Sequence, residues 1–181
     1  GDNPVYEELF NTPVDVASTR EGEVTGARML LNRGAQQLKA DQPYEAIRSL
    51  GRVLTPLSKH ESRKGLVRAL YLCSSAYERV GLPWAARGTA VVASSIATND
   101  FWSYGEVTPL QATCYYQVRG LEVQLGRLPQ TLTWHQVYCG VMGVLAEKGY
   151  DVEWPEDAEL QFDAILGLRF LKADLAQLQP L

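Results

Sequence analysis

The residues able to act as nucleophiles, acids, bases or metal ligands are few and widely spaced. Cys73, Cys114 and Cys139 contain no CxxC pair, and each sits inside an apolar helical pattern. His60 and His135 have no second His or Cys at the spacing of a metal site. The spacing therefore predicts three thiols used as small apolar side chains, no metal site and no cofactor.

No catalytic residue is predicted either. The chain lacks HExxH, GxGxxG, P-loop and GxSxG motifs. Glu7-Glu8 lies in an irregular end, and Glu156-Asp157 suits the first turn of a helix, where negative charge is favourable. We expect a protein that is not an enzyme. The alternative is an all-α enzyme whose pocket starts from His135, Tyr138 and Cys139, although His135 better fits a hydrogen-bonded core position.

The composition describes a globular chain of one domain or one compact repeat array. Its 181 residues are 46% hydrophobic, 9% aromatic and 21% charged. The net charge of −4 disfavours nucleic acid, and the two long uncharged stretches are too short or too polar to span a membrane. The polar N-terminus and the odd cysteine count predict a reducing, cytoplasmic location. Because Gly1 is not Met, the chain fits either a protein from which a tag has been cleaved or an excised piece of a longer protein.

Apolar residues recur at three- and four-residue steps and predict helices with no strand. In the second helix the expected buried stripe includes Tyr44, and in the fourth it includes Trp84 and Val92. Thr55-Pro56 is expected to end the second helix, and Ser18 with Glu21 to cap the first. The expected helices cover residues 18–40, 43–55, 66–80, 83–97, 110–125, 129–148 and 156–178.

The turns between helices resemble one another. Gln42-Pro43-Tyr44-Glu45-Ala46 matches Leu82-Pro83-Trp84-Ala85-Ala86 and, more weakly, Leu128-Pro129-Gln130-Thr131-Leu132, at proline intervals of 40 and 46 residues. A repeated helix–turn–helix unit is typical of a helical solenoid. The predicted fold class is all-α: antiparallel helix pairs stacked as a short α-solenoid, with about three pairs and a C-terminal capping helix. A generic helical repeat or a plain helical bundle is the alternative.

The second unit resembles a tetratricopeptide repeat. Tyr77 and Gly81 stand where that family ends its helix A, and Ala86, Ala90 and Ala93 stand where helix B packs closely. In the first unit Gly34, Ala46 and Leu50 match, whereas Asp41 replaces the usual glycine. In the third unit Gly126 is one residue out of step. The resemblance spans about residues 24–148. The expected organisation is an irregular segment 1–17, a tetratricopeptide-like repeat domain 18–148, and a loop with a capping helix at 149–181.

The resemblance also implies a ligand groove lined by the first helix of each pair. Its expected face is polar and mildly basic, and arginine there can hold a carboxylate of an acidic segment or a free C-terminus. The alternative is a plain solvated helix face. The candidate residues are Arg28, Asn32, Gln36 and Lys39 in the first unit, Arg68, Tyr71, Ser75 and Arg79 in the second, and Tyr116 and Gln124 in the third.

Two further surfaces have alternative explanations. An aromatic loop, 98–109, holds Phe101, Trp102 and Tyr104, which either anchor a partner or fold back over a helix-pair edge. A basic cluster either contacts a polyanion or is a solvated face; its members are Arg48, Arg52, Lys59, His60, Arg63, Lys64 and Arg68.

Together these features predict a protein–protein interaction module that binds a peptide or partner protein in its groove. The alternative is a regulatory or assembly domain of a larger protein, acting through intramolecular contacts or as a homodimer. The last helix or the aromatic loop would then form the contact.

Overall fold

The computed structural model describes residues 20–60 and 62–152, and this part of the chain is all-helical, with no strand. The expected cap at Ser18, the segment 1–17 and the helix at 156–178 lie outside the described residues. The chain divides into two compact units, residues 1–141 and 142–181. The six helices are α2 (Arg20–Lys39), α3 (Pro43–Lys59), α4 (Arg63–Arg79), α5 (Pro83–Tyr104), α6 (Pro109–Gln124) and α7 (Leu128–Glu147).

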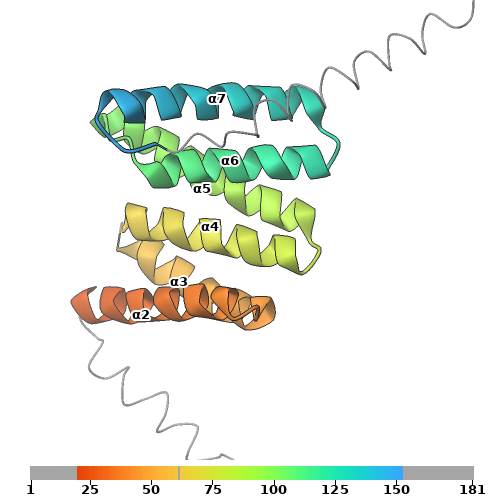
Figure 1. The fold of residues 1–181 in the computed structure, drawn as a ribbon. Helices are drawn as coiled ribbons and strands as arrows, with labels where there is room; N and C mark the ends of the chain where they lie inside the picture. The colour runs from red at the N-terminus through yellow and green to blue at the C-terminus, as the bar shows by residue number, and fades with distance from the viewer. Residues whose placement is uncertain (1–19, 61, 153–181) are drawn as a thin grey trace, which may run out of the picture. The chain divides into compact units, whose positions relative to one another are not determined.

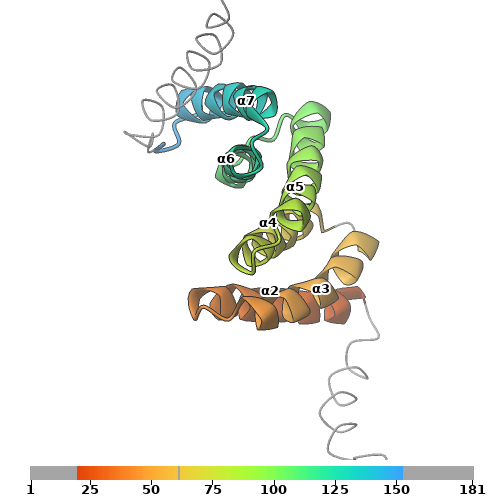
Figure 2. The ribbon, with the colours of Figure 1, turned by 90° about the vertical axis from the view of Figure 1, so that its right-hand side faces the viewer.

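In the first unit each helix from α2 to α5 packs against the next along the chain, as the ribbon shows (Figure 1). Viewed at right angles, α2 and α4 lie on one side, and α3 and α5 on the other (Figure 2). In addition, α2 contacts α4 directly. Side chains of α6 contact those of α7 at Tyr115–Trp134 and Tyr116–Tyr138.

The same three-residue turn joins α2 to α3, α4 to α5 and α6 to α7. Its middle residue has a left-handed backbone in all three places: Asp41 (φ 55°), Gly81 (φ 75°) and Gly126 (φ 71°). The next amide closes the turn in each case, as Leu82 N does to Tyr77 O at 2.9 Å. Asp41 therefore adopts the left-handed conformation that glycine has in the other two turns.

The third turn is not out of step at its glycine. Gly126 precedes the start of α7 at Leu128 by two residues, as Gly81 precedes the start of α5. What has moved is the proline, which opens α3 and α5 but occupies the second position of α7. Because proline is tolerated anywhere in the first turn of a helix, this shift leaves the turn unchanged.

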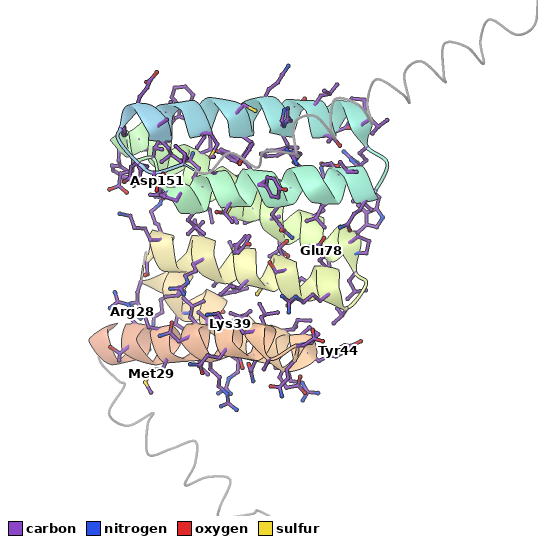
Figure 3. The ribbon with its side chains drawn as sticks, viewed as in Figure 1. Arg28, Met29, Lys39, Tyr44, Glu78 and Asp151 are labelled. Carbon is purple, nitrogen blue, oxygen red and sulfur yellow. The ribbon has the colours of Figure 1, made fainter. Side chains whose placement is uncertain are left out.

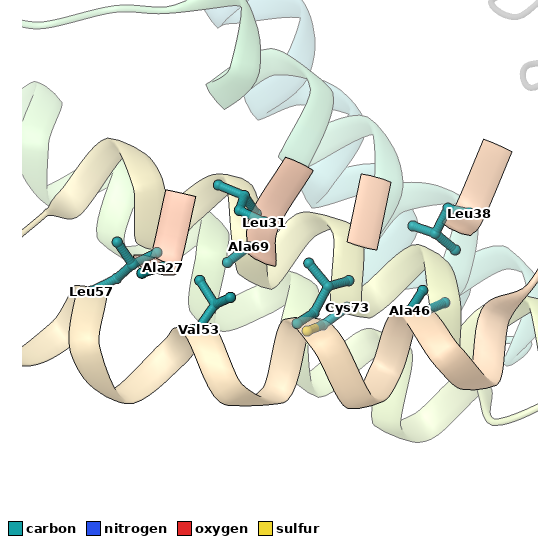
Figure 4. Close-up of a cluster of buried hydrophobic side chains, with 10 residues drawn as sticks. Ala27, Leu31, Leu38, Ala46, Val53, Leu57, Ala69 and Cys73 are labelled. Atoms are coloured by element: carbon teal, nitrogen blue, oxygen red, sulfur yellow. The ribbon is translucent and has the colours of Figure 1, made fainter. Parts of the chain in front are cut away.

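An apolar core fills the space between α2, α3 and α4 (Figure 4). Gly34 is buried in this core. A Cβ at this position would lie 2.7 Å from Leu50 Cδ2, so the absence of a side chain allows α2 and α3 to approach this closely. The members of this apolar core are Ala27, Leu31, Leu38, Ala46, Leu50, Val53, Leu57, Ala69, Cys73 and Ala76.

Helix α5 turns a row of small residues inward. Ala86, Ala90, Ala93 and Ala97 are buried, at the four- and three-residue steps of one helix face. The expectation from apolar periodicity was wrong here, because Trp84 and Val92 are exposed. The same holds for Tyr44 on α3. Small side chains bring the helix axes close together, and the bulky ones are left outside.

Two helices run further than expected. Proline removes one helical hydrogen bond and kinks a helix rather than always ending it, and α3 continues past Pro56 to Lys59. Figures 1 and 2 show its last turns angled away from the rest of the helix. Helix α5 continues to Tyr104, where Gly105 provides a left-handed cap. All three aromatic residues of 98–109 therefore lie on this helix and not on a loop.

In the second unit the described residues are 142–152, the end of α7 and the turn after it. Gly149 is left-handed (φ 80°), and Tyr150 N donates to Leu145 O at 3.1 Å. This is the hydrogen-bond pattern of the three turns in the first unit.

Candidate functional site

A cavity of about 890 Å³ lies where α2, α3, α4 and α5 come together. The angled end of α3 contributes Leu57 and Ser58, and α2 contributes Arg28, which Figure 3 shows beside the start of α4. Its other lining residues are Ser62, Arg63, Lys64, Leu66, Ile96, Asp100, Tyr104 and Glu106. The cavity thus joins one residue of the predicted groove, Arg28, to one of the predicted aromatic set, Tyr104.

Ion pairs hold the walls of this cavity. Arg63 Nε lies 2.6 Å from Asp100 Oδ1, and Lys64 Nζ lies 3.1 Å from Glu106 Oε2. The first turn of α4 is thus tied both to the end of α5 and to the segment that follows it. Arg28, by contrast, makes no ion pair with any described residue. It is the one lining cation whose charge is not offset by a described carboxylate.

The last turn of α5 exposes two aromatic rings, of which that of Tyr104 lines the cavity. Trp102 is 78% exposed and Tyr104 is 67% exposed. Phe101 is half-buried, with its ring edge-on to Trp102 at 5.2 Å. The alternative that all three fold back over a helix-pair edge is wrong for Trp102 and Tyr104.

The predicted groove residues on α2 are all solvent-facing: Arg28, Asn32, Gln36 and Lys39. On α4, Arg68 is exposed, while Tyr71 and Ser75 are half-buried. Ser75 Oγ donates to Tyr71 O at 3.3 Å, within its own helix. The exposed members are therefore available to solvent on two of the three helices that the resemblance assigns to the groove.

Two of the predicted groove residues are used to join helices. The Arg79 guanidinium on α4 donates to Leu38 O at 2.5 Å and lies 3.7 Å from Asp41 Oδ1, so it caps the end of α2. Gln124 on α6 donates to Glu78, which also accepts from Gln117 Nε2 at 2.6 Å. Figure 3 shows Glu78 between α4 and α6. These contacts fix the spacing of α2, α4 and α6.

The basic cluster is largely paired. Lys59 and His60 both contact Glu23, and Arg63 and Lys64 contact Asp100 and Glu106. Hydrogen bonds from His60 and then Lys59 lower the pKa of Glu23. His60 is a helix-end residue with a carboxylate partner on α2, which its sequence neighbours do not reveal. Most of the charge that could attract a polyanion is thus engaged within the protein.

A second polar group lies between α6 and α7. Arg119 is 7% exposed, with its guanidinium 4.4 Å from the Tyr116 ring centroid and 5.9 Å from that of Tyr138. Its NH1 atom lies 3.1 Å from His135 Nδ1, and His135 Nε2 lies 3.6 Å from Cys139 Sγ. Of the three residues named as the start of an enzyme pocket, His135 and Cys139 are therefore in contact, and Tyr138 lies near the Arg119 guanidinium that contacts His135.

A buried carboxylate joins α5, α6 and the turn before α7. Glu122 is fully buried, with Oε1 2.8 Å from Arg87 Nε and Oε2 2.7 Å from Arg127 Nε. The Arg127 guanidinium also lies 5.7 Å from the ring centroid of Trp84, which is 60% exposed. Sequence analysis missed this cluster, because the residues lie up to 40 positions apart and each alone resembles a surface charge.

The cysteines fall into two kinds. Burial raises the pKa of the Cys73 thiol to about 11 and that of Cys114 to about 12, as expected for thiols used as apolar side chains. Cys139 is half-buried and in contact with His135. Among residues 20–60 and 62–152, no group of His, Cys, Asp and Glu has the arrangement of a metal site.

Comparison with known proteins shows no matching family model, no matching curated protein and no matching solved structure. No helix in the described part of the chain combines the length and apolar character needed to cross a membrane.

Proposed function

We propose that this chain is a tetratricopeptide-like module that binds a segment of another protein. In this proposal its helix pairs are antiparallel and stack as an α-solenoid. The support is the turn that recurs at Asp41, Gly81 and Gly126 with one hydrogen-bond pattern and one length. Three equivalent turns favour three equivalent helix pairs, and rigid pairs present a preformed surface that loses little conformational entropy on binding.

The exposed aromatic edge beside the cavity is the observation that carries the proposal. Trp102 and Tyr104 expose large apolar surfaces to solvent at the end of a long helix, and Tyr104 also lines the cavity of about 890 Å³. Aromatic side chains of this kind supply much of the binding free energy of protein interfaces, because each buries a large area with few rotatable bonds. We therefore place the partner over this edge, with one of its side chains in the cavity.

Charge favours an acidic partner. Between residues 20 and 152 the chain has fifteen Lys and Arg and eleven Asp and Glu, an excess of four positive charges, although the whole chain has a charge of −4. Arg28 in the cavity and Arg68 on α4 make no ion pair with described residues. An acidic side chain or a C-terminal carboxylate of the partner would pair bidentately with either guanidinium.

The polar face of α2, α4 and α6 continues the same site in this proposal. Arg68, Tyr71 and Tyr116 extend it from the cavity along the first helix of each pair. Arg79 and Gln124 serve it indirectly, since they fix the helix spacing through Leu38, Asp41 and Glu78. The proposal includes the cytoplasm as the location and assigns no catalytic step to the chain.

The test is affinity capture of partners from source lysate, followed by calorimetric titration of the identified partner. Trp102→Ala with Tyr104→Ala, and separately Arg28→Glu, are expected to weaken binding at least about tenfold, the effect of losing an interface anchor. Tyr44→Ala and Arg33→Glu are the matched controls, since both residues are exposed outside the site. Equal affinity for all variants would overturn this placement. Arg68→Glu is tested beside them, and a loss of affinity confined to this variant would move the site onto the α2–α4–α6 face.

A homodimer is the second candidate, favoured by the same exposed rings. If Trp102 and Tyr104 bury each other across a two-fold axis, the pure protein is dimeric without a partner. Light scattering after gel filtration decides this directly. A wild-type dimer that becomes monomeric on Trp102→Ala with Tyr104→Ala would support the assembly function in place of partner binding.

A further inference from the structure

Cys139 differs from the other two cysteines in having a nitrogen beside its sulfur. Its Sγ lies 3.6 Å from His135 Nε2, one helical turn away on α7. Cys73 and Cys114 are buried among apolar side chains, where desolvation disfavours the thiolate. A histidine beside a cysteine is a common means of stabilising a reactive thiolate.

Arg119 fixes which histidine nitrogen holds the proton. A guanidinium has only N–H donors, and its NH1 lies 3.1 Å from His135 Nδ1. Nδ1 must therefore accept, so the proton of the neutral imidazole is on Nε2. Nε2–H then points its hydrogen at Cys139 Sγ, which has to accept it.

This arrangement favours the thiolate over the thiol. An N–H donor is more strongly bound by an anionic sulfur than by a neutral one. The Arg119 positive charge acts in the same direction through the ring, and it opposes a second proton on His135. The titratable and charged groups that face this contact from the described parts of α6 and α7 are Arg119, Tyr116, His135 and Tyr138.

Arg119 is itself held in place. It is 7% exposed and stacks against the Tyr116 ring at 4.4 Å, so its position does not depend on a mobile side chain at the surface. Cys139 is half-buried, which leaves part of the residue accessible to a small reagent. The structure therefore combines a positioned donor, a nearby fixed charge and access from solvent.

We propose that Cys139 is a covalent modification site that reacts as its thiolate with small disulfide compounds. The Cys139 sulfur attacks one sulfur of the disulfide, and a new S–S bond forms as the old one breaks. The electron pair of the broken bond leaves with the second sulfur, which takes a proton from water. The product is a mixed disulfide on Cys139, and no further oxidant is needed.

This site stands without the partner-binding proposal, with which it shares Tyr116, the ring that stacks on Arg119. It uses none of the residues lining the cavity or the exposed edge of α5. Within the part of the chain that the structure describes, it is formed entirely by α6 and α7.

The test measures modification of each cysteine by mass spectrometry between pH 5 and 10, with iodoacetamide and with glutathione disulfide as probes. We expect Cys139 to react first, with a midpoint in its rate profile below about 8.5, the ordinary pKa of a cysteine thiol. His135→Phe should raise this midpoint and slow the reaction at pH 7. Each rise of the midpoint by about one pH unit lowers the thiolate fraction, and hence the rate at pH 7, roughly tenfold. At pH 10 the two proteins should react alike.

His60→Phe is the matched control, because it removes the other histidine, which pairs with Glu23 and not with a cysteine. Cys73 and Cys114 report on folding in every sample, since they react only if the core opens. If Cys73 and Cys114 become reactive in His135→Phe, the test uses His135→Gln in its place. Because glutamine keeps an N–H donor, His135→Gln is expected to retain a midpoint below about 8.5. A wild-type midpoint at or above that value, or an unchanged profile in His135→Phe, would overturn the proposal.

Discussion

The apolar core of α2, α3 and α4 and the contacts of α6 hold helices together by different means. The apolar core contains no charged side chain, and its closest approach depends on Gly34 against Leu50. Helix α6 buries Gln111, Tyr115, Arg119 and Glu122 alongside its apolar residues. Helix α6 therefore contacts its neighbours on two sides through polar groups that must each find a partner.

The buried polar groups of α6 fix the register of the helices that they join, whereas the apolar core of α2, α3 and α4 does not. Thr98 Oγ1 lies 2.5 Å from Tyr115 OH, which also accepts from Gln111 Nε2 at 2.8 Å, so α5 and α6 meet in one register. An apolar contact tolerates a small slide between helices, because dispersion has no direction. A buried hydrogen bond does not, since a lost partner leaves a desolvated group.

The largest effect is expected at Glu122. Glu122→Ala leaves the guanidinium groups of Arg87 and Arg127 without their shared carboxylate, and we expect a loss of about 3–5 kcal/mol in the free energy of unfolding. The measurement is urea denaturation followed by circular dichroism. We expect that no removal of a single charged side chain from α2, α3 or α4 lowers the free energy of unfolding as much.

The matched variant replaces the whole cluster. Arg87→Met with Glu122→Met and Arg127→Met removes the charges together, so no buried ion is left alone. This triple variant is expected to be more stable than Glu122→Ala, because an apolar replacement of a complete buried pair is often neutral. If the triple variant were the less stable of the two, the ion pairs themselves, and not the stranded charges, would provide the stability.

A smaller effect, still destabilising, is expected at Gly34. The methyl group of Gly34→Ala would lie 2.7 Å from two Leu50 atoms, so α2 and α3 must separate or Leu50 must change rotamer. Overpacking of this kind costs about 1–3 kcal/mol. Chemical denaturation measures it, and the direction is opposite to the usual gain from replacing a helical glycine.

Gly51→Ala is the control in the same region. A Cβ there meets nothing within 4 Å, and the residue is exposed on α3. This change should raise stability by about 0.5–1 kcal/mol through the lower backbone entropy of the unfolded chain. Two Gly→Ala changes of the same sign would show that Leu50 does not set the distance between α2 and α3.

The sequence predicted the helices and their turns better than their exposed faces. The left-handed turn residue could be located because few residue types adopt a positive φ between two helices. Glycine does so readily, and Asp41 stands in the equivalent place in the first turn. The buried face of α5 followed from the family resemblance at Ala86, Ala90 and Ala93, and apolar periodicity missed it at Trp84. Hydropathy ranks a tryptophan above an alanine, whereas close helix packing requires the smaller residue.

The parts of the site that escaped prediction depend on partners distant in the chain. Asp100 and Glu106 face Arg63 and Lys64 only because α5 runs past Ala97 to Tyr104 and the kinked α3 continues past Pro56. A local pattern gives the face of a helix on which a charge lies. It does not give the helix that lies opposite, so the predicted basic cluster looked unpaired.

The smallest effect separates an exposed ion pair from the buried one. Glu23 contacts His60 and Lys59 at the edge of the apolar core, and these hydrogen bonds lower its pKa from 4.5. A carboxyl whose pKa is lower when folded stabilises the protein above its unfolded pKa and loses that contribution as pH falls through the folded one. The Tm difference between wild type and Glu23→Gln should therefore be present at pH 7 and shrink below pH 4.5. Because Glu23 and Lys59 remain in contact with water, the difference at pH 7 should be far smaller than that of Glu122→Ala. A pH-independent difference would show that Glu23 acts through packing and not through its charge.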